Sequence, residues 1–308
     1  LKPLAPRPGL FKHIFCLRML KKLRPQDGFP WFVQFASLAL SLLALLTFLT
    51  SGLAHWSLKA ILLFLLGVIA WIPRPLVDAA QLFFDRRDVL TSYPRELAER
   101  AGGKLPLLAL TIDDAPADAY DRRPAKSSCT AEIRAVLERH GARATWFVIG
   151  SHVRGDRQQM LKEMAAGGHE LANHGMVDRP AWLLGREEFP SDVEEAQRIV
   201  EGCGGGQRRW FRPGHALFTP WQLQWLRSRG FRLALGSIYP HDALDLPPWQ
   251  CSQPDLLAWA LVAKAQAGDV IIIHDRPWTP RVLELALPQL VGRFQVCTLS
   301  QLADACEK

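Results

Sequence analysis

The sequence predicts an α/β protein whose parallel strands form a sheet or a barrel. Two observations predict this class. From residue 105 onward, short apolar runs alternate with amphipathic stretches, and polar residues follow the apolar runs at the point where each run ends. Hydrophobic residues make up 49% of the 308-residue chain and charged residues 22%, a composition that excludes wholesale disorder.

The apolar runs in this part of the chain are predicted strands. They are short, rich in aliphatic and aromatic residues, and bounded by polar residues or glycine. The predicted strands cover residues 107–112, 144–149, 169–171, 210–211, 231–236, 270–274 and 294–298.

Helices are predicted between these strands from apolar positions at helical spacing and from residues that end helices. Two capping boxes, in which a Ser or Thr side chain bonds the backbone three residues later, indicate further helix starts. The predicted helices cover residues 131–140, 157–166 and 279–292, and the capping boxes are Ser191-x-x-Glu194 and Thr219-Pro220-x-Gln222.

The positive charge of the chain is concentrated at its N-terminal end. Residues 1–30 contain seven Lys or Arg residues and one acidic residue, Asp27. The formal charge of +7 for the whole chain therefore leaves +1 for the other 278 residues. A nearly neutral globular part lacks the basic face that binds phosphate backbones, so we expect no nucleic-acid partner.

Residues 31–72 predict a membrane anchor. No charged residue occurs between 31 and 58, and about 20 apolar residues suffice to cross a bilayer. A second apolar run at 60–72 is shorter than a full span, so two topologies stay open: one crossing with an interfacial helix, or a hairpin of two helices. We expect an integral membrane protein that contacts lipid through this segment.

The predicted organisation therefore has four parts. A basic segment at 1–30 precedes the anchor at 31–72, a charged neck covers 73–104, and residues 105–308 form the catalytic-size domain. The side of the membrane on which this domain lies is left open by the charges around the anchor.

Two adjacent carboxylates, Asp113 and Asp114, follow the first predicted strand. Neighbouring carboxylates are costly to hold together without a cation, and a strand directs neighbours to opposite faces. Asp114 could therefore bind a metal together with His174 and Asp178, which lie four residues apart. One histidine with two carboxylates suits zinc or a similar divalent ion. The alternative is a turn cap and a structural loop histidine.

Polar residues also follow three later strands. Arg212 and His215 come after the strand at 210–211, Tyr239 and Asp242 after the strand at 231–236, and His274 ends the strand at 270–274. In parallel α/β proteins such strand ends meet at one edge, where functional residues collect.

Four of these segments, in this order, resemble the motifs of the polysaccharide deacetylases of the NodB type. The resemblance covers about residues 105–305. It implies a distorted (β/α) barrel, here preceded by one or two N-terminal membrane helices. The segments are Thr111-Ile-Asp113-Asp114-Ala-Pro116, Gly168-His-Glu-Leu-Ala-Asn-His174, Phe211-Arg-Pro-Gly214 and Ile271-Ile-Ile-His-Asp275.

The resemblance implies a metal-dependent hydrolase that removes N-acetyl groups, or O-acetyl groups as a variant, from a carbohydrate. The expected substrates are chitin-like or peptidoglycan-like polymers, a class that favours an extracytoplasmic site of action. One divalent ion is implied, zinc first, with cobalt, nickel or manganese as alternatives. Its ligands would be Asp114, His174 and Asp178, the last replacing the histidine that is usual in the family.

The same resemblance assigns roles to the remaining residues. Asp113 would be the general base, oriented by Arg212, and His274 the general acid. The backbone N–H of His215 would support the oxyanion and Asp242 would orient His274, with Asp275 as a rival. Trp182, Tyr239 and Trp278 are candidates for the substrate groove, although core packing explains such aromatic residues equally well.

Two other functions stay open from the sequence. A catalytically inactive relative could bind sugar or act as a membrane scaffold, and Asp178 in place of a histidine favours it. A different metal hydrolase, such as a phosphoesterase, would need more carboxylates and histidines around two ions than this sequence offers.

Overall fold

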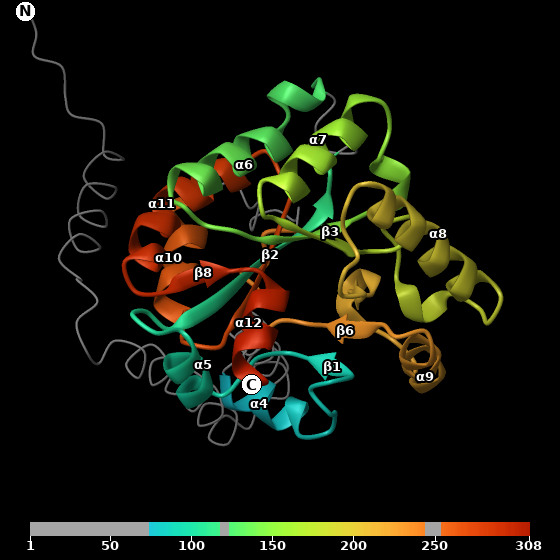
Figure 1. Cartoon of the computed structure of the whole chain (residues 1–308), viewed down its shortest axis with the longest axis horizontal. Coiled ribbons are helices and arrows are strands. Elements are labelled where there is room, and N and C mark those ends of the chain that lie inside the picture. Colours follow the sequence, from blue (N-terminus) through green and yellow to red (C-terminus); the bar gives the residue numbers. More distant parts are fainter. Residues whose placement is uncertain (1–73, 118–122, 244–253) are drawn as a thin grey trace, which may run out of the picture. The chain divides into compact units, whose positions relative to one another are not determined.

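The computed structural model describes residues 74–117, 123–243 and 254–308 (Figure 1). The basic segment predicted at 1–30 and the membrane anchor predicted at 31–72 lie outside these residues. Within the described ranges, no helix combines the length and the apolar character needed to cross a membrane.

Parallel strands build the centre of the fold, in the order β1-β6-β5-β4-β3-β2-β7, with β8 paired to the first part of β2. Every residue of β2 is buried, as expected for a strand covered on both faces. The strands are β1 (Val89–Leu90), β2 (Leu107–Ala115), β3 (Thr145–Val148), β4 (Glu170–Asn173), β5 (Trp210–Phe211), β6 (Arg232–Ala234), β7 (Val270–His274) and β8 (Gln295–Cys297).

Helices surround the sheet (Figure 1), and α11 packs against both α10 and α6. The helices are α4 (Arg74–Gln81), α5 (Arg95–Ala101), α6 (Cys129–Arg139), α7 (Asp156–Ala166), α8 (Glu188–Gly202), α9 (Pro220–Ser228), α10 (Pro254–Lys264), α11 (Thr279–Val291) and α12 (Leu299–Cys306).

The sheet curls toward a barrel. Ile238, in the segment that follows β6, forms a parallel bridge with Ile271 of β7, which joins the two sides of the sheet. Alternating parallel strands and helices confirm the predicted α/β class. The distorted barrel places the carboxyl ends of β2, β4, β5 and β7 at one edge.

Most of the predicted elements form close to their expected bounds, and one helix start is wrong. Thr219 caps α9 in a complete capping box with Gln222, as predicted. Ser191 instead lies inside α8, which begins at Glu188. Pro190 is tolerated in the first turn because the backbone N–H groups there have no intrahelical acceptor, so the helix starts before the expected cap.

The segment predicted as a neck contributes to the same core as the barrel. β1 pairs in parallel with β6, and Val89 aligns with Leu233. Leu90, Tyr93 and Ala98 are buried within the main hydrophobic cluster. The sequence between residues 89 and 98 therefore packs with the strands rather than separately from them.

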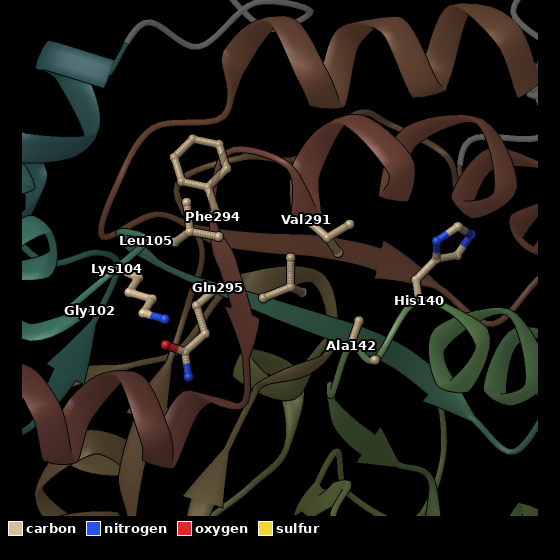
Figure 2. Close-up of a pocket in the computed structure, with 10 residues that line it drawn as sticks. Gly102, Lys104, Leu105, His140, Ala142, Val291, Phe294 and Gln295 are labelled. Carbon is tan, nitrogen blue, oxygen red and sulfur yellow. The ribbon is translucent and has the colours of Figure 1, made fainter.

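A cavity of about 270 Å³ opens beside the amino end of β2 (Figure 2). It is lined by Leu105, by Ala142 before β3 and by Phe294 before β8. Asp113 lies eight residues after Leu105, and at roughly 3.3 Å per strand residue this separation is about 26 Å. The cavity is therefore remote from the polar residues at the carboxyl ends of the strands.

His169 is a buried histidine at the start of β4. Its Nδ1 atom accepts the backbone N–H of Ala144 at 3.3 Å, and its ring meets Trp146 edge-on. No described residue provides a hydrogen-bond partner for its Nε2 atom. Burial, followed by the charge of Arg143, lowers the pKa of His169 to about 4.

Because the folded state disfavours protonated His169, its stabilising contribution is complete above pH 6.5 and is lost as the pH falls toward 4. We expect the free energy of unfolding to lose roughly 2 kcal/mol from this group between pH 8 and pH 5. His169→Asn retains an acceptor for Ala144 and cannot titrate. Urea unfolding of both chains at the two pH values should show this difference, and equal pH slopes would contradict it.

Candidate functional site

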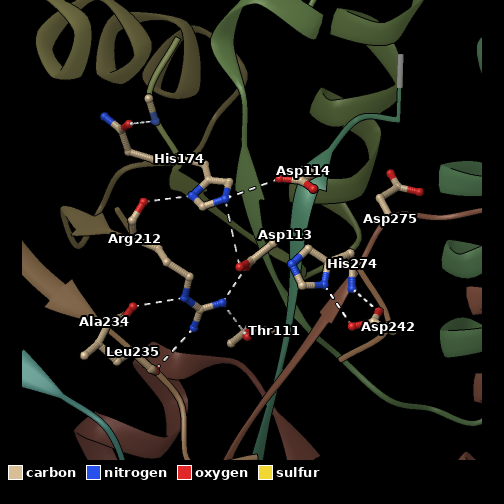
Figure 3. A network of polar contacts seen from close by, with 12 residues as sticks. Thr111, Asp113, Asp114, His174, Arg212, Ala234, Leu235, Asp242, His274 and Asp275 are labelled. Atoms are coloured by element: carbon tan, nitrogen blue, oxygen red, sulfur yellow. Dashed lines mark hydrogen bonds and ion pairs between the residues drawn. The ribbon is translucent and has the colours of Figure 1, made fainter. Parts of the chain in front are cut away.

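A buried ion pair between Asp113 and Arg212 lies at the centre of the site (Figure 3). Asp113 is near the carboxyl end of β2, and Arg212 directly follows β5. The Nη1 atom of Arg212 donates to Oδ1 of Asp113 at 2.5 Å and to the hydroxyl of Thr111 at 2.8 Å. Asp113 is thereby held next to a fixed positive charge.

The rest of the Arg212 guanidinium is also satisfied. Its Nε donates to the carbonyl of Ala234 at 3.0 Å and its Nη2 to that of Leu235 at 3.3 Å. The guanidinium lies over the ring of Phe147, 4.0 Å from its centroid. Burial lowers the pKa of Arg212, although the charge of Asp113 opposes this effect. The bonds of the guanidinium to Thr111 of β2 and to the carbonyl of Ala234 of β6 fix its orientation.

His174 follows β4 and points its Nε2 atom at both carboxylates (Figure 3). Its Nδ1 donates to the carbonyl of Arg212 at 2.8 Å, while Nε2 lies 3.4 Å from Oδ1 of Asp114 and 4.0 Å from Oδ2 of Asp113. Burial lowers the pKa of His174, but the hydrogen bond of Asp114 and both carboxylate charges raise it above its usual value.

Asp114 has a left-handed backbone with a φ of 64°, which separates its side chain from that of Asp113. Its Oδ2 accepts a hydrogen bond from Nη2 of Arg276 at 2.6 Å, and both side chains are buried. Burial raises the pKa of Asp114, but His174, followed by the charges of His274 and Arg276, lowers it well below its ordinary range.

His274, the last residue of β7, is paired with Asp242. The backbone N–H and the Nδ1 atom of His274 reach the two carboxylate oxygens of Asp242 at 2.7 and 2.9 Å. The ring of Tyr239 meets that of His274 edge-on, with centroids 5.7 Å apart. Burial lowers the pKa of His274, but Asp242, with smaller contributions from Asp113 and Asp114, raises it to about 9.

The donor chemistry of Asp114 and His174 fits a divalent cation. The Nδ1 atom of His174 is anchored on a backbone carbonyl, which leaves Nε2 directed at Asp114, an arrangement typical of metal-binding histidines. Among residues 74–117, 123–243 and 254–308, however, no three His, Cys, Asp or Glu side chains are grouped closely enough to hold a metal. The structure therefore assembles two of the three predicted ligands.

Asp178, the third predicted ligand, lies in the exposed loop after β4. Within the described part of the chain it forms neither a hydrogen bond nor an ion pair. The sequence spacing allowed this residue to share a turn with His174, but the loop directs it to solvent. Its role as a ligand stays a prediction.

The other predicted residues lie in different surroundings. His215 is exposed and has a left-handed φ of 59° at the turn after β5. Trp182 is 46% exposed in the turn Ala181–Leu183, so it is available to a ligand. Trp278 packs against the main hydrophobic cluster, which supports the core-packing alternative for this residue.

Of the two charged residues after β7, Asp275 was expected from the sequence either to cap its loop or to orient His274, whereas Arg276 was given no role. Asp275 accepts hydrogen bonds from the hydroxyl of Thr130 and the N–H of Ala117, so it fixes the turn after β2 rather than His274. Burial raises the pKa of Asp275 to about 6. Arg276 forms an ion pair with Asp114. The sequence feature that could have indicated Arg276 is its position directly after His274 and Asp275.

The turn that contains His215 lies against the loop that contains Asp178. A Cβ atom at Gly214 would lie 2.1 Å from the carbonyl oxygen of Arg179. Since this neighbour is backbone, only glycine allows the two loops to approach so closely.

Comparison with known proteins identifies relatives of the chain. The family profile described as polysaccharide deacetylase matches residues 102–234. A chitooligosaccharide deacetylase of Sinorhizobium fredii is 30% identical over 189 residues, which cover 61% of this chain and 78% of that protein.

Solved structures share the fold. The peptidoglycan deacetylase PdaC from Bacillus subtilis is 25% identical, with a TM-score of 0.56 over 66% of this chain and 93% of that one. A pseudoenzyme of the CE4 family from Bacillus anthracis is 17% identical, with a TM-score of 0.57 over 70% of this chain and 69% of that one.

The pairing of Asp242 with His274 predicts a measurable pKa change. Asp242→Asn retains the shape of the side chain and removes its charge, so the imidazolium loses its main stabilising partner. We expect the pKa of His274 to fall from about 9 toward 6.5. NMR titration of the imidazole ring should detect this, with Asp304→Asn on the surface as control. An unchanged pKa in Asp242→Asn would contradict the assignment.

Proposed function

Because the chain belongs to the polysaccharide deacetylase family, we propose that it is a hydrolase that removes acetyl groups from a carbohydrate polymer. The named relatives act on chitooligosaccharides and peptidoglycan, which supports an N-acetylated amino sugar as the substrate. An O-acetylated sugar is the second substrate class, since the same attack on an acyl carbon cleaves an ester.

The observation that carries this proposal is the pairing of two proton-transfer groups. Asp113 of β2 and His274 of β7 are direct neighbours in the strand register. Arg212 keeps Asp113 beside a positive charge, while Asp242 favours the protonated form of His274. A base and an acid held side by side match hydrolysis, in which one proton is taken and another is given.

In this mechanism Asp113 accepts a proton from the attacking water as its oxygen bonds to the acyl carbon. The backbone N–H of His215 is proposed to donate to the oxyanion that develops. His274 then donates a proton to the sugar nitrogen as the carbon–nitrogen bond breaks, which releases acetate and a free amine. Arg212 orients Asp113 throughout, and Asp242 orients His274.

We propose that Asp114 and His174 hold a divalent ion, with Asp178 as the third ligand expected from the sequence. When bound, such an ion polarises the acyl carbonyl as a Lewis acid. The support is the orientation of the His174 ring, whose Nδ1 is fixed by a backbone carbonyl. Zinc is the ion we propose first, and cobalt, nickel and manganese share the same ligand chemistry.

Two aromatic residues are proposed to contact the sugar. Trp182 has an exposed ring, and Tyr239 lies beside His274 at the carboxyl edge of the sheet. Exposed aromatic faces suit the apolar faces of sugar rings. Trp278, the third candidate from the sequence, packs against the main hydrophobic cluster, and its place in the groove stays a prediction.

We propose that the enzyme acts at a membrane through the predicted anchor at 31–72, with an extracytoplasmic site of action that suits a cell-wall polymer. Supporting this, Leu82 and Phe83 after α4 are 85% and 84% exposed. They lie ten and eleven residues beyond the end of the apolar run, so exposed apolar side chains follow the predicted anchor closely in the chain.

An inactive sugar-binding or scaffold protein is the second candidate. The observation in its favour is that Asp178 is exposed and that no three-donor group is found among the described residues. A structural neighbour is itself named a pseudoenzyme, a statement that applies to that protein. The paired Asp113 and His274 favour the enzyme, because sugar binding alone needs no paired base and acid.

Substitutions of Asp113 and of His174 should affect proton transfer and ion binding differently. Asp113→Asn is expected to reduce acetate release about a hundredfold or more, because the base is lost, with zinc binding nearly unchanged. His174→Ala is expected to lose both acetate release and zinc binding, because a ligand of the ion is removed. Acetate release from chitin oligomers, peptidoglycan fragments and acetylated xylan measures turnover, and calorimetry measures zinc binding. Asp255→Asn, at an exposed position in α10, is the control, and equal loss of zinc in both site variants would refute this division.

The third ligand can be tested by restoring the usual histidine of the family. We expect Asp178→His to preserve zinc binding, because imidazole is as good a ligand as carboxylate at this position. Calorimetric titration of zinc into the variant and into the unchanged chain measures the difference. Loss of binding in the variant would show that position 178 does not reach the ion.

A further inference from the structure

Arg276 is a buried cation directly beside the proposed ion site. Its side chain is 3% exposed, and it follows β7 two residues after His274. The Nη2 atom donates to Oδ2 of Asp114 at 2.6 Å, and Nη1 donates to the carbonyl of Asp275 at 3.2 Å. The backbone contact restrains the guanidinium, so Arg276 meets Asp114 in a defined orientation.

The two oxygens of Asp114 therefore have different surroundings. Oδ2 is engaged by Arg276, whereas Oδ1 lies 3.4 Å from Nε2 of His174. A short, charge-assisted hydrogen bond is strong, so Oδ2 would have to weaken its bond to Arg276 in order to bind a second cation. Asp114 consequently presents a single oxygen on the side of the site that His174 faces.

Charges in the site are also matched in pairs. Asp113 is paired with Arg212 and Asp114 with Arg276, and all four side chains are buried. A divalent ion entering this site meets carboxylates that already have positive partners. Repulsion from a buried guanidinium is weakly screened by salt, so it lowers the affinity for the ion.

We propose that Arg276 is a positioning residue that limits Asp114 to one-oxygen ligation and keeps the divalent ion weakly bound. This proposal rests on the proposed function, since it takes Asp114 as a ligand of the ion. Arg276 would therefore act on the ion through Asp114, whereas Arg212 orients the proposed base Asp113.

The test measures cobalt(II) binding to the metal-free full chain by calorimetry and by visible absorption, which reports the ligands around cobalt. Arg276→Gln keeps a hydrogen-bond donor for Asp114 and removes the charge, and we expect it to bind cobalt about tenfold more tightly. Arg276→Lys keeps the charge and is expected to bind like the unchanged chain. Arg293→Met removes another partly buried arginine, bonded to the carbonyls of Val262 and Ala265, and serves as the matched control.

The outcomes separate this proposal from the proposed function. Equal or weaker binding by Arg276→Gln, with binding by the unchanged chain intact, overturns only the role of Arg276. If neither chain binds cobalt, both the role of Arg276 and the proposed metal dependence fail. Should Arg276→Gln not fold, Arg276→Met removes the same charge: tighter cobalt binding than that of the unchanged chain supports the role of Arg276, and equal or weaker binding overturns it.

Discussion

The buried ion pair between Arg212 and Asp113 is the interaction on which the rest of the site depends. Arg212 follows β5, yet its guanidinium bonds side chains of β2 and backbone carbonyls at the end of β6, and its own carbonyl fixes His174 after β4. Loss of one partner from such a pair leaves an uncompensated buried charge, which costs about 3–5 kcal/mol. Fold stability and site geometry therefore rest on the same contacts.

The polar groups of the site are oriented before any ligand arrives. The two histidines of the site each have one ring nitrogen held by a hydrogen bond, so that the other nitrogen faces the site. A backbone carbonyl holds Nδ1 of His174, and Asp242 holds Nδ1 of His274. Such preorganisation lowers the cost of arranging dipoles during a reaction. His174, Arg212 and Asp242 lie in loops, but the parallel strands that end beside them set their positions.

The sequence predicted most of the strands and the convergence of the polar residues that follow them, because such residues meet at one edge of a parallel sheet. The pairing of Asp113 with Arg212 and of Asp242 with His274 was expected from the resemblance to the deacetylase family, and both contacts form. The rule does not extend to Asp178, whose direction is set by its loop. The sequence interpretation also missed Arg276, whose partner Asp114 is 162 residues away in the chain. β1 and α12 were missed because short elements are stabilised mainly by packing rather than by local pattern.

The close approach of Gly214 to the carbonyl of Arg179 has a consequence for attempts to redesign specificity. Any side chain introduced at 214 must displace a peptide group, so selection from a random library will return glycine there. Diversity is better introduced at the exposed Leu217, because His215 and Ala216 have left-handed φ values of 59° and 58° that most side chains disfavour. Because the turn and the neighbouring loop are in backbone contact, longer insertions in one of them will require compensating changes in the other.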